Sequence, residues 1–187
     1  MRYLILSDIH GSLPILEQVL KFYDEGKYDM LLLLGDLLNY GPRNGLFHGL
    51  DAPGVARLLS CHSNHIVAVR GNCDSEVDQM LLPFPIMSDY AIVCDGCHRI
   101  FLTHGHIYNE QNLPPSPSCE IFFYGHTHLW TLQSAREDRP AICNTGSPTF
   151  PKDGNPPTFA TLEDGTLSVR HLDGTILQQI TVYKPVG

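Results

Sequence analysis

The first part of the chain alternates short apolar runs with amphipathic segments, and this alternation limits the fold more than any other feature. The apolar runs lie at 2–7, 29–36 and 65–72. Between them, segments 12–26 and 52–64 carry apolar residues at the spacing of one helix face. We expect a helix in both, the first capped by Ser12 and followed at its end by Gly26. Apolar strands joined by helices predict parallel βαβ units, and therefore an α/β fold.

The pattern changes after residue 85, where turns replace helices. Strand-like runs are separated by three Asp-Gly pairs, at 95–96, 164–165 and 173–174. Such pairs are typical of hairpins. One more buried strand is expected at 120–124, after a loop at 112–118. The second half is therefore predicted to be mostly antiparallel. No break in composition divides the two halves, so we expect a single domain over residues 1–187.

Composition and charge narrow the function classes. No apolar run approaches the roughly 20 residues of a membrane span. The N-terminus turns polar too soon for a signal peptide. We therefore expect a cytoplasmic protein that binds no membrane. The formal net charge of −8 argues against an extended nucleic-acid groove. It is compatible with a small phosphorylated ligand, since two divalent ions would bring the sum to about −4.

Asp, Asn or His stands at the end of each buried run. The runs end in "SDIH", "GDLLN", "RGNCD", "THGH" and "GHTH". Ligands of α/β sheets bind outside the carboxyl ends of the strands, so five segments direct metal-ligating side chains toward one rim. Asp8 and His10 lie two residues apart, as do His126 and His128. If the chain is extended there, each pair points to one side, and Ile9 points into the core. Mixed ligands of this kind suit manganese, iron, zinc or nickel rather than calcium.

These five motifs, in this order, resemble the signature of the calcineurin-like metallophosphoesterases, and most closely their small bacterial single-domain phosphodiesterases. The resemblance covers nearly the whole chain. It implies a four-layer fold, in which a sandwich of two sheets is flanked by helices. It also implies a site for two divalent ions, with manganese expected and zinc, iron or nickel as alternatives. The implied metal ligands are Asp8, His10, Asp36 and His128 for the first ion, and Asp36, Asn72, His104 and His126 for the second.

Within the resemblance, Asp36 would bridge the ions, because a carboxylate has two oxygens. A bridging metal-bound hydroxide would then attack the phosphorus of a small phosphodiester. Residues expected to assist catalysis are Asn72, Cys73, Asp74, His106 and Arg43. His106 would either contact phosphate or hold a metal ligand in place without contacting phosphate. Arg43 would bind phosphate or cap a loop.

Cys73 is a departure from the wider family, which often has histidine after the ligand asparagine. A thiol is a poorer match than imidazole for protonating a leaving group.

Two other functions stay open. A phosphomonoesterase would use the same site on a small phosphorylated metabolite. A non-catalytic scaffold that binds protein partners usually loses metal ligands, and all seven are present here. The antiparallel half offers an edge for a homodimer or a homotetramer.

Overall fold

A computed structural model of the chain describes residues 1–115 and 119–183. The loop expected at 112–118 therefore lies partly outside the described residues. The elements in chain order are β1 (Arg2–Leu6), α1 (Leu13–Gly26), β2 (Met30–Leu33), α2 (Ala52–Ser60), η1 (Ser63–His65), β3 (Ile66–Ala68), α3 (Glu76–Leu81), β4 (Tyr90–Asp95), β5 (His98–Thr103), β6 (Ile121–Tyr124), β7 (Trp130–Gln133), β8 (Ala141–Thr145), β9 (Thr158–Glu163), β10 (Thr166–His171) and β11 (Ile176–Thr181).

The first sheet has six strands in the order β11-β10-β9-β1-β2-β3. β1, β2 and β3 are parallel, as the alternating pattern predicted, and α1 and α2 connect them. The last three strands extend this sheet beyond β1 and are antiparallel. The N-terminal and C-terminal parts of the chain thus share one sheet.

The second sheet has five strands in the order β4-β5-β6-β8-β7. The hairpin predicted at 95–96 joins β4 to β5. At the centre of this sheet, β5, β6 and β8 are parallel, and β4 and β7 pair antiparallel at the edges. The mostly antiparallel second half is confirmed, but with this parallel centre. β7 and β8 were not expected, since their short apolar runs lack flanking Asp-Gly signals.

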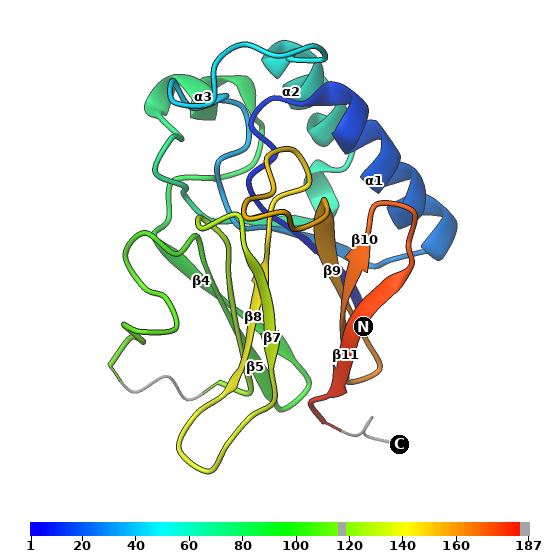
Figure 1. Cartoon of the computed structure of the whole chain (residues 1–187), viewed down its shortest axis with the longest axis vertical. Helices are drawn as coiled ribbons and strands as arrows, with labels where there is room; N and C mark the ends of the chain where they lie inside the picture. Colours follow the sequence, from blue (N-terminus) through cyan, green and yellow to red (C-terminus); the bar gives the residue numbers. More distant parts are fainter. Residues whose placement is uncertain (116–118, 184–187) are drawn as a thin grey trace.

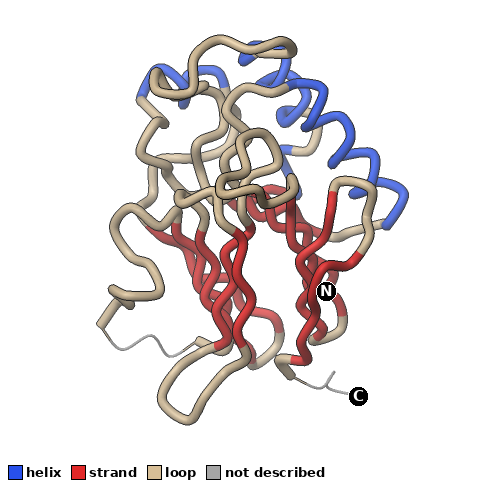
Figure 2. The backbone as a smooth tube through the Cα atoms, viewed as in Figure 1, coloured by secondary structure: helices blue, strands red, loops and turns tan. Residues whose placement is uncertain are grey.

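The two sheets pack face to face, with helices along one side (Figures 1 and 2). Leu16, Val19 and Leu20 of α1 are buried in the core between the helices and the first sheet. A second core lies between the sheets and includes Ile5 and Phe123. The expected two-sheet α/β sandwich is confirmed. In the described part of the chain, the outer face of the second sheet is covered by loop side chains such as Tyr108 and Leu113, not by a helix.

Three details of the helices differ from expectation. Ser12 is at the N-cap of α1, but its side chain makes no capping hydrogen bond there. The helix includes Gly26, and Lys27 takes the left-handed conformation that ends it. α2 ends at Ser60, short of residue 64, because the 3₁₀ turn η1 intervenes. Among the described residues the longest helix has 14 residues, whereas a membrane span needs about 20.

Candidate metal centre

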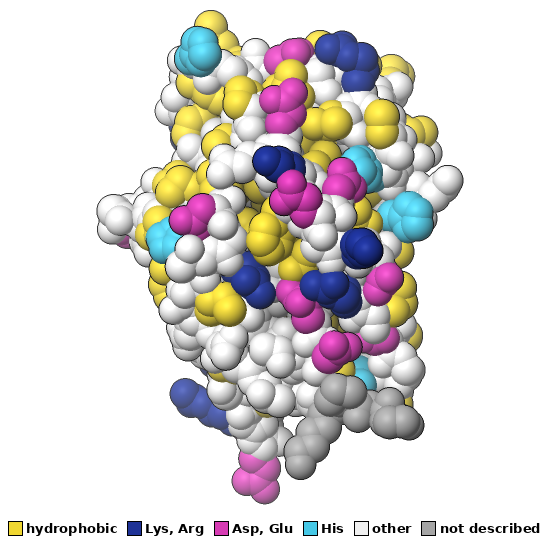
Figure 3. Space-filling model, turned by 90° about the vertical axis from the view of Figure 1, so that its right-hand side faces the viewer, with side chains coloured by type: hydrophobic (Ala, Val, Ile, Leu, Met, Phe, Trp, Pro, Cys, Tyr) yellow, Lys and Arg dark blue, Asp and Glu magenta, His cyan; other side chains and the backbone are white. Residues whose placement is uncertain are grey.

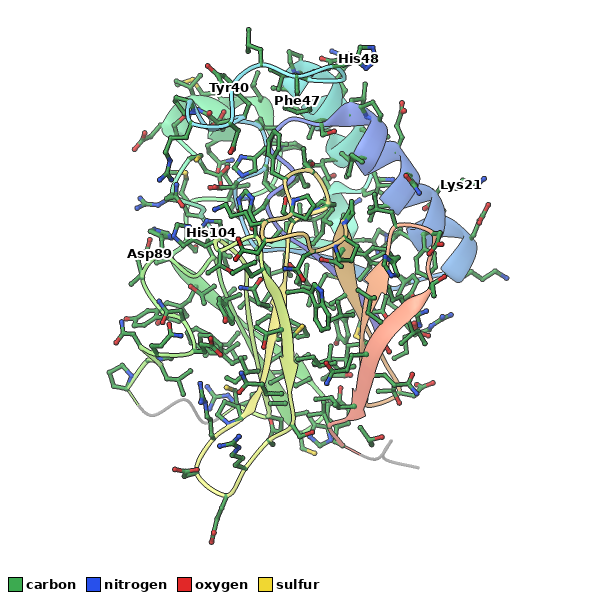
Figure 4. The ribbon with its side chains drawn as sticks, in the orientation of Figure 1. Lys21, Tyr40, Phe47, His48, Asp89 and His104 are labelled. Carbon is green, nitrogen blue, oxygen red and sulfur yellow. The ribbon has the colours of Figure 1, made fainter. Side chains whose placement is uncertain are left out.

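The carboxyl ends of five strands meet at one rim of the sandwich, as the motif positions predicted. Asp8 follows β1, Asp36 follows β2 and Asn72 follows β3. His104 comes directly after β5, and His126 follows β6. Figure 4 shows His104 above the strand ends and below the loop that carries Tyr40 and Phe47. Segments that are far apart in sequence thus bring their polar side chains to one place.

The backbone at this rim is not extended, contrary to the expectation for the two histidine-containing pairs. Five ligand candidates have positive φ: Asp8 at 56°, His10 at 52°, Asp36 at 53°, His126 at 66° and His128 at 62°. This left-handed region is costly for most side chains, but Asp and His enter it more often than others. Local strain of this kind concentrates at functional sites. Ile9 is fully buried, as expected.

Backbone carbonyls fix the orientation of three imidazoles. The Nδ1–H of His10 donates to the Asn39 carbonyl at 2.8 Å, and that of His128 to the Phe150 carbonyl at 2.6 Å. His104 donates in the same way to Leu34 at 2.7 Å. With the proton held on Nδ1, each Nε2 keeps its lone pair and faces the site. This is the arrangement that metal-ligating histidines adopt.

The first cluster consists of acceptors that face one another. Nε2 of His10 and Nε2 of His128 are 3.2 Å apart. Oδ1 of Asp8 lies 3.3 Å from the His128 nitrogen and 3.6 Å from the His10 nitrogen. This oxygen is buried and has no hydrogen-bond partner, although a buried carboxylate oxygen is costly to leave unpaired. A cation at the centre would satisfy all three atoms, so the residues fit a divalent metal.

Asp36 stands between this cluster and a second one. Its Oδ2 lies 3.7 Å from Nε2 of His10 and 3.6 Å from Nε2 of His104. Its Oδ1 accepts the Cys73 N–H at 2.8 Å. One oxygen of Asp36 thus accepts a backbone N–H, and the other faces both clusters. Oδ1 of Asn72 completes the second group, 3.1 Å from the His104 nitrogen.

His126 is placed differently from the other histidines. Its backbone N–H donates to Oδ2 of Asp8 at 2.9 Å. Its ring lies beside the second cluster, with the ring centres of His126 and His104 5.1 Å apart. The two histidines of "GHTH" therefore lie beside different clusters, His128 at the first and His126 at the second.

Two glycines allow this close packing. A Cβ atom on Gly125 would lie 2.0 Å from Oγ of Ser7 and 2.6 Å from Oδ2 of Asp8. A Cβ atom on Gly71 would lie 2.1 Å from Oδ1 of Asp36. Both contacts are too short for any real side chain, so the backbone must approach the two carboxylates directly.

Burial and mutual charges shift the pKa values of the site. Burial alone would raise the pKa of Asp8, but His104, His10 and His128 outweigh it and hold that pKa well below its usual range. Burial lowers the pKa of His10, but Asp8, the Asn39 carbonyl and Asp36 outweigh it and raise the pKa above its usual value. The pKa of His126 is lowered, by burial first and then by His104.

The thiol of Cys73 is also shifted. Burial, together with the nearby charges of Asp36, Asp74 and Asp8, raises its pKa to about 12. In the metal-free protein the thiol is therefore neutral at physiological pH. It lies close to the first cluster, because ligand atoms of Cys73, His10 and Asp36 lie within 4.8 Å of one another.

A pocket of about 740 Å³ opens above the clusters. Six ligating or neighbouring residues line its floor: His10, Asp36, Asn72, Cys73, His126 and His128. Its outer wall comes from two loops and includes Asn39, Arg43, Asn44 and Lys152. Lys152 was not anticipated from sequence. In the sequence it is a single basic residue in the "FPKDGN" loop, and nothing there predicts that this loop lies beside the metal-ligand candidates.

Two predicted catalytic residues lie outside the pocket lining. Asp74 is buried, and its oxygens accept the backbone N–H groups of Asp36, Leu37 and Gly71 at 2.7–2.9 Å. It therefore holds the backbone that carries a ligand. His106 lies beside His104 and His126, with ring centres 5.4 and 6.2 Å away. Its two ring nitrogens are buried and have no hydrogen-bond partner among the described residues.

The segment that follows β8 supports the ligand loops. Oγ of Ser147 donates to the Asp8 carbonyl at 2.9 Å. The side-chain amide of Asn144 donates to the Gly125 carbonyl and to Oγ1 of Thr127, both at 2.9 Å. The "NTGSP" motif thus ties the first and fifth ligand segments together.

A two-sheet α/β sandwich with clustered carboxylates and imidazoles at its strand ends defines a metallophosphoesterase. Consistent with this, the model of the calcineurin-like phosphoesterase superfamily domain matches residues 1–166. The chain belongs to this family.

Comparisons with individual proteins agree with this family assignment. The chain is 44% identical over 185 residues to phosphodiesterase YfcE of Escherichia coli K12, covering 97% of this chain and 98% of that protein. The solved structure of the phosphoesterase Yfce from E. coli superposes with a TM-score of 0.92 at 42% identity, covering 98% of this chain and 100% of that one. Vps29 of Entamoeba histolytica, solved in complex with zinc, shares the fold at a TM-score of 0.63 and 20% identity, covering 98% of this chain and 100% of that one.

Proposed function

We propose that the protein is a metal-dependent phosphodiesterase that hydrolyses a small phosphodiester. The observation that carries the proposal is the convergence of unpaired acceptors at the pocket floor. Nε2 of His10 and Nε2 of His128 are 3.2 Å apart, beside a buried Asp8 oxygen without a partner. The 44% identity to phosphodiesterase YfcE supports the choice of diester over monoester.

Two divalent ions fit the residues present. Asp8, His10 and His128 would hold one ion, and Asn72, His104 and His126 the other, with Oδ2 of Asp36 between them. Manganese is the expected metal, with zinc, iron and nickel as alternatives. When bound, two such ions lower the pKa of a shared water and offset charge on phosphoryl oxygens.

The chain's own residues prepare the site for this chemistry. The carbonyls of Asn39, Leu34 and Phe150 hold the Nδ1 protons, which keeps the Nε2 lone pairs free. The neutral thiol of Cys73, with its pKa raised to about 12, is a poor nucleophile, because the thiolate is the reactive form. Its side chain instead lines the pocket beside His10 and Asp36, where it would face the leaving oxygen of a bound diester.

The test is hydrolysis of bis(p-nitrophenyl) phosphate by metal-free protein reconstituted with manganese, with metal content measured in parallel. We expect turnover that depends on the added metal and much slower hydrolysis of p-nitrophenyl phosphate. Faster hydrolysis of the monoester would favour the phosphomonoesterase. Full metal occupancy without turnover of either ester would favour the scaffold.

A further inference from the structure

Two basic side chains, Arg43 and Lys152, line the pocket opposite the metal ligands. Across residues 1–115 and 119–183, neither side chain has an ion-pair or hydrogen-bond partner. Carboxylates pair with five other basic residues of the chain: Arg2, Lys21, Arg57, Arg70 and Arg170. On the side of the molecule that carries α1, basic and acidic side chains are interspersed (Figure 3). In a chain of net charge −8, two uncompensated cations in one pocket form a place for an anion.

The loop that carries Arg43 is fixed to one metal-ligand candidate. The Asn39 carbonyl accepts the Nδ1–H of His10 at 2.8 Å. Oδ1 of Asn39 accepts the Gly41 N–H at 2.9 Å, and the Gly41 carbonyl accepts the Asn44 N–H at 2.9 Å. Arg43 therefore sits in a turn whose start is anchored to His10.

The loop that carries Lys152 is fixed to a second metal-ligand candidate, His128. The Phe150 carbonyl accepts the Nδ1–H of His128 at 2.6 Å, and the Lys152 N–H donates to the His128 carbonyl at 3.2 Å. Oγ of Ser147 also accepts the Phe150 N–H at 2.9 Å. The backbone of Lys152 is thus held beside His128.

The two loops also contact each other. The rings of Phe47 and Phe150 meet edge to face, with centres 5.0 Å apart, and the Phe150 ring lies 5.6 Å from that of His10. Figure 4 shows Phe47 on the loop above the strand ends. Both cations therefore belong to the side of the pocket above His10 and His128, and not to the side of His104.

The pocket is much larger than one phosphate needs. About 740 Å³ falls in the range of roughly 300–1,000 Å³ that holds drug-sized ligands. If the scissile phosphate lies on the pocket floor, the pocket has room for an ester arm that extends toward Arg43 and Lys152.

We propose that Arg43 and Lys152 form a second anion subsite, and that the substrate is a phosphodiester with a further phosphate on the arm that extends over His10 and His128. This inference rests on the proposed function and names its substrate class. Arg43 would bind that phosphate through two N–H groups, and Lys152 as a point charge.

The experiment uses two chromogenic diesters that differ by one phosphate. They are thymidine 5′-(p-nitrophenyl phosphate) and the same compound with a 3′-phosphate. For the manganese-loaded wild type we expect kcat/KM to be about tenfold higher for the 3′-phosphorylated diester, mainly through KM. The ratio of the two kcat/KM values should fall about five- to tenfold in Lys152→Met and in Arg43→Met. A general loss of activity cancels in this ratio.

Lys21→Met is the matched control, because Lys21 lies on α1, far from the pocket (Figure 4), and we expect it to keep the wild-type ratio. A second measurement is calorimetric binding of thymidine 3′,5′-bisphosphate and of thymidine 5′-phosphate. The bisphosphate should bind about tenfold more tightly to the wild type, and this preference should vanish in Lys152→Met.

The outcomes separate the subsite from the proposed function. Equal kcat/KM for the two diesters in an active wild type would overturn the subsite and leave the phosphodiesterase intact. Hydrolysis of neither diester by fully loaded protein would count against the phosphodiesterase. In that case the calorimetric preference, and its loss in Lys152→Met, still supports the anion subsite, whereas equal binding of both nucleotides refutes it.

Discussion

The change Asp36→Asn alters a side chain that faces both clusters. Its Oδ2 lies 3.7 Å from Nε2 of His10 and 3.6 Å from Nε2 of His104. The amide is the same size, and its oxygen can still accept the Cys73 N–H that Oδ1 now accepts at 2.8 Å. The amide NH₂ would then point at the imidazole lone pairs. We therefore expect the fold to survive and the metal to be lost.

The size of the effect follows from linkage between metal binding and folding. Loss of a residue that merely orients a ligand weakens metal binding about 10–100-fold, so loss of Asp36 should cost at least about 100-fold. A free metal concentration of about 100 times Kd stabilises the wild type by about 2.7 kcal/mol per site, and the same concentration stabilises the variant by about 0.4 kcal/mol. In a chain of this length, these energies raise the Tm of the wild type by about 5–11 °C and the Tm of the variant by about 1–2 °C.

The assay compares the Tm of metal-free and manganese-loaded protein and counts bound metal per chain. Asp24→Asn, on the exposed side of α1, is a matched control that should keep the full Tm rise. The variant Asp36→Asn should lose hydrolysis of bis(p-nitrophenyl) phosphate. If it keeps two ions per chain and turnover near wild type, the assignment of the site is wrong.

Three further predictions concern the same site. Cys73→Ala should keep substantial activity on a nitrophenyl diester, and Cys73→His should speed only diesters with poorly departing alcohols; an inactive, fully metal-loaded Cys73→Ala protein would point to a direct chemical role for the thiol. Gly125→Ala should lower the free energy of unfolding by about 1–3 kcal/mol and weaken metal binding, since the new Cβ would lie 2.0 Å from Oγ of Ser7; denaturant unfolding and metal titration test this. His10 must be neutral to bind metal, and its pKa is raised, so metal affinity should fall as the pH is lowered through that pKa. In the metal-free protein, protonated His10 stabilises the folded state. This stabilisation is fully present below the pKa of His10 in the unfolded chain, about 6.5, and is lost as the pH rises through the higher pKa of His10 in the folded state. Calorimetry in two buffers of different ionisation enthalpy would detect the released proton, and an equal heat in both would contradict the assignment.

The strand ends could be predicted from the sequence because each one is marked locally. An apolar run followed by Asp, Asn or His shows both where the strand stops and what it presents, so residues such as Asp8, Asp36 and His104 could be named. The parallel order of β5, β6 and β8 could not be predicted, because pairing across a sheet depends on contacts between distant segments. Lys152 was missed for the same reason, as its place depends on how its loop packs against Phe47 and His128.

The left-handed backbone at five candidate ligands could not be predicted from the sequence either. It bears on how the site is held in the absence of metal. At about 1 kcal/mol or more for each such residue, this conformation persists only if other contacts impose it. The structure supplies such contacts from the backbone. Asp8 N–H donates to the Gly35 carbonyl at 3.1 Å, and His10 N–H to the Asp36 carbonyl at 2.9 Å.

Side chains complete this framework. The buried carboxylate of Asp74 accepts the N–H groups of Asp36 and Gly71 at 2.8 and 2.7 Å, and Oδ2 of Asp8 accepts that of His126 at 2.9 Å. These bonds use none of the atoms that face the cluster centres. The protein therefore fixes the directions of these candidate ligands without metal, and the entropy of ordering them would not have to be met by metal binding. Asp74, named from sequence as catalytic, contributes in this way, since it holds the turn on which Asp36 stands.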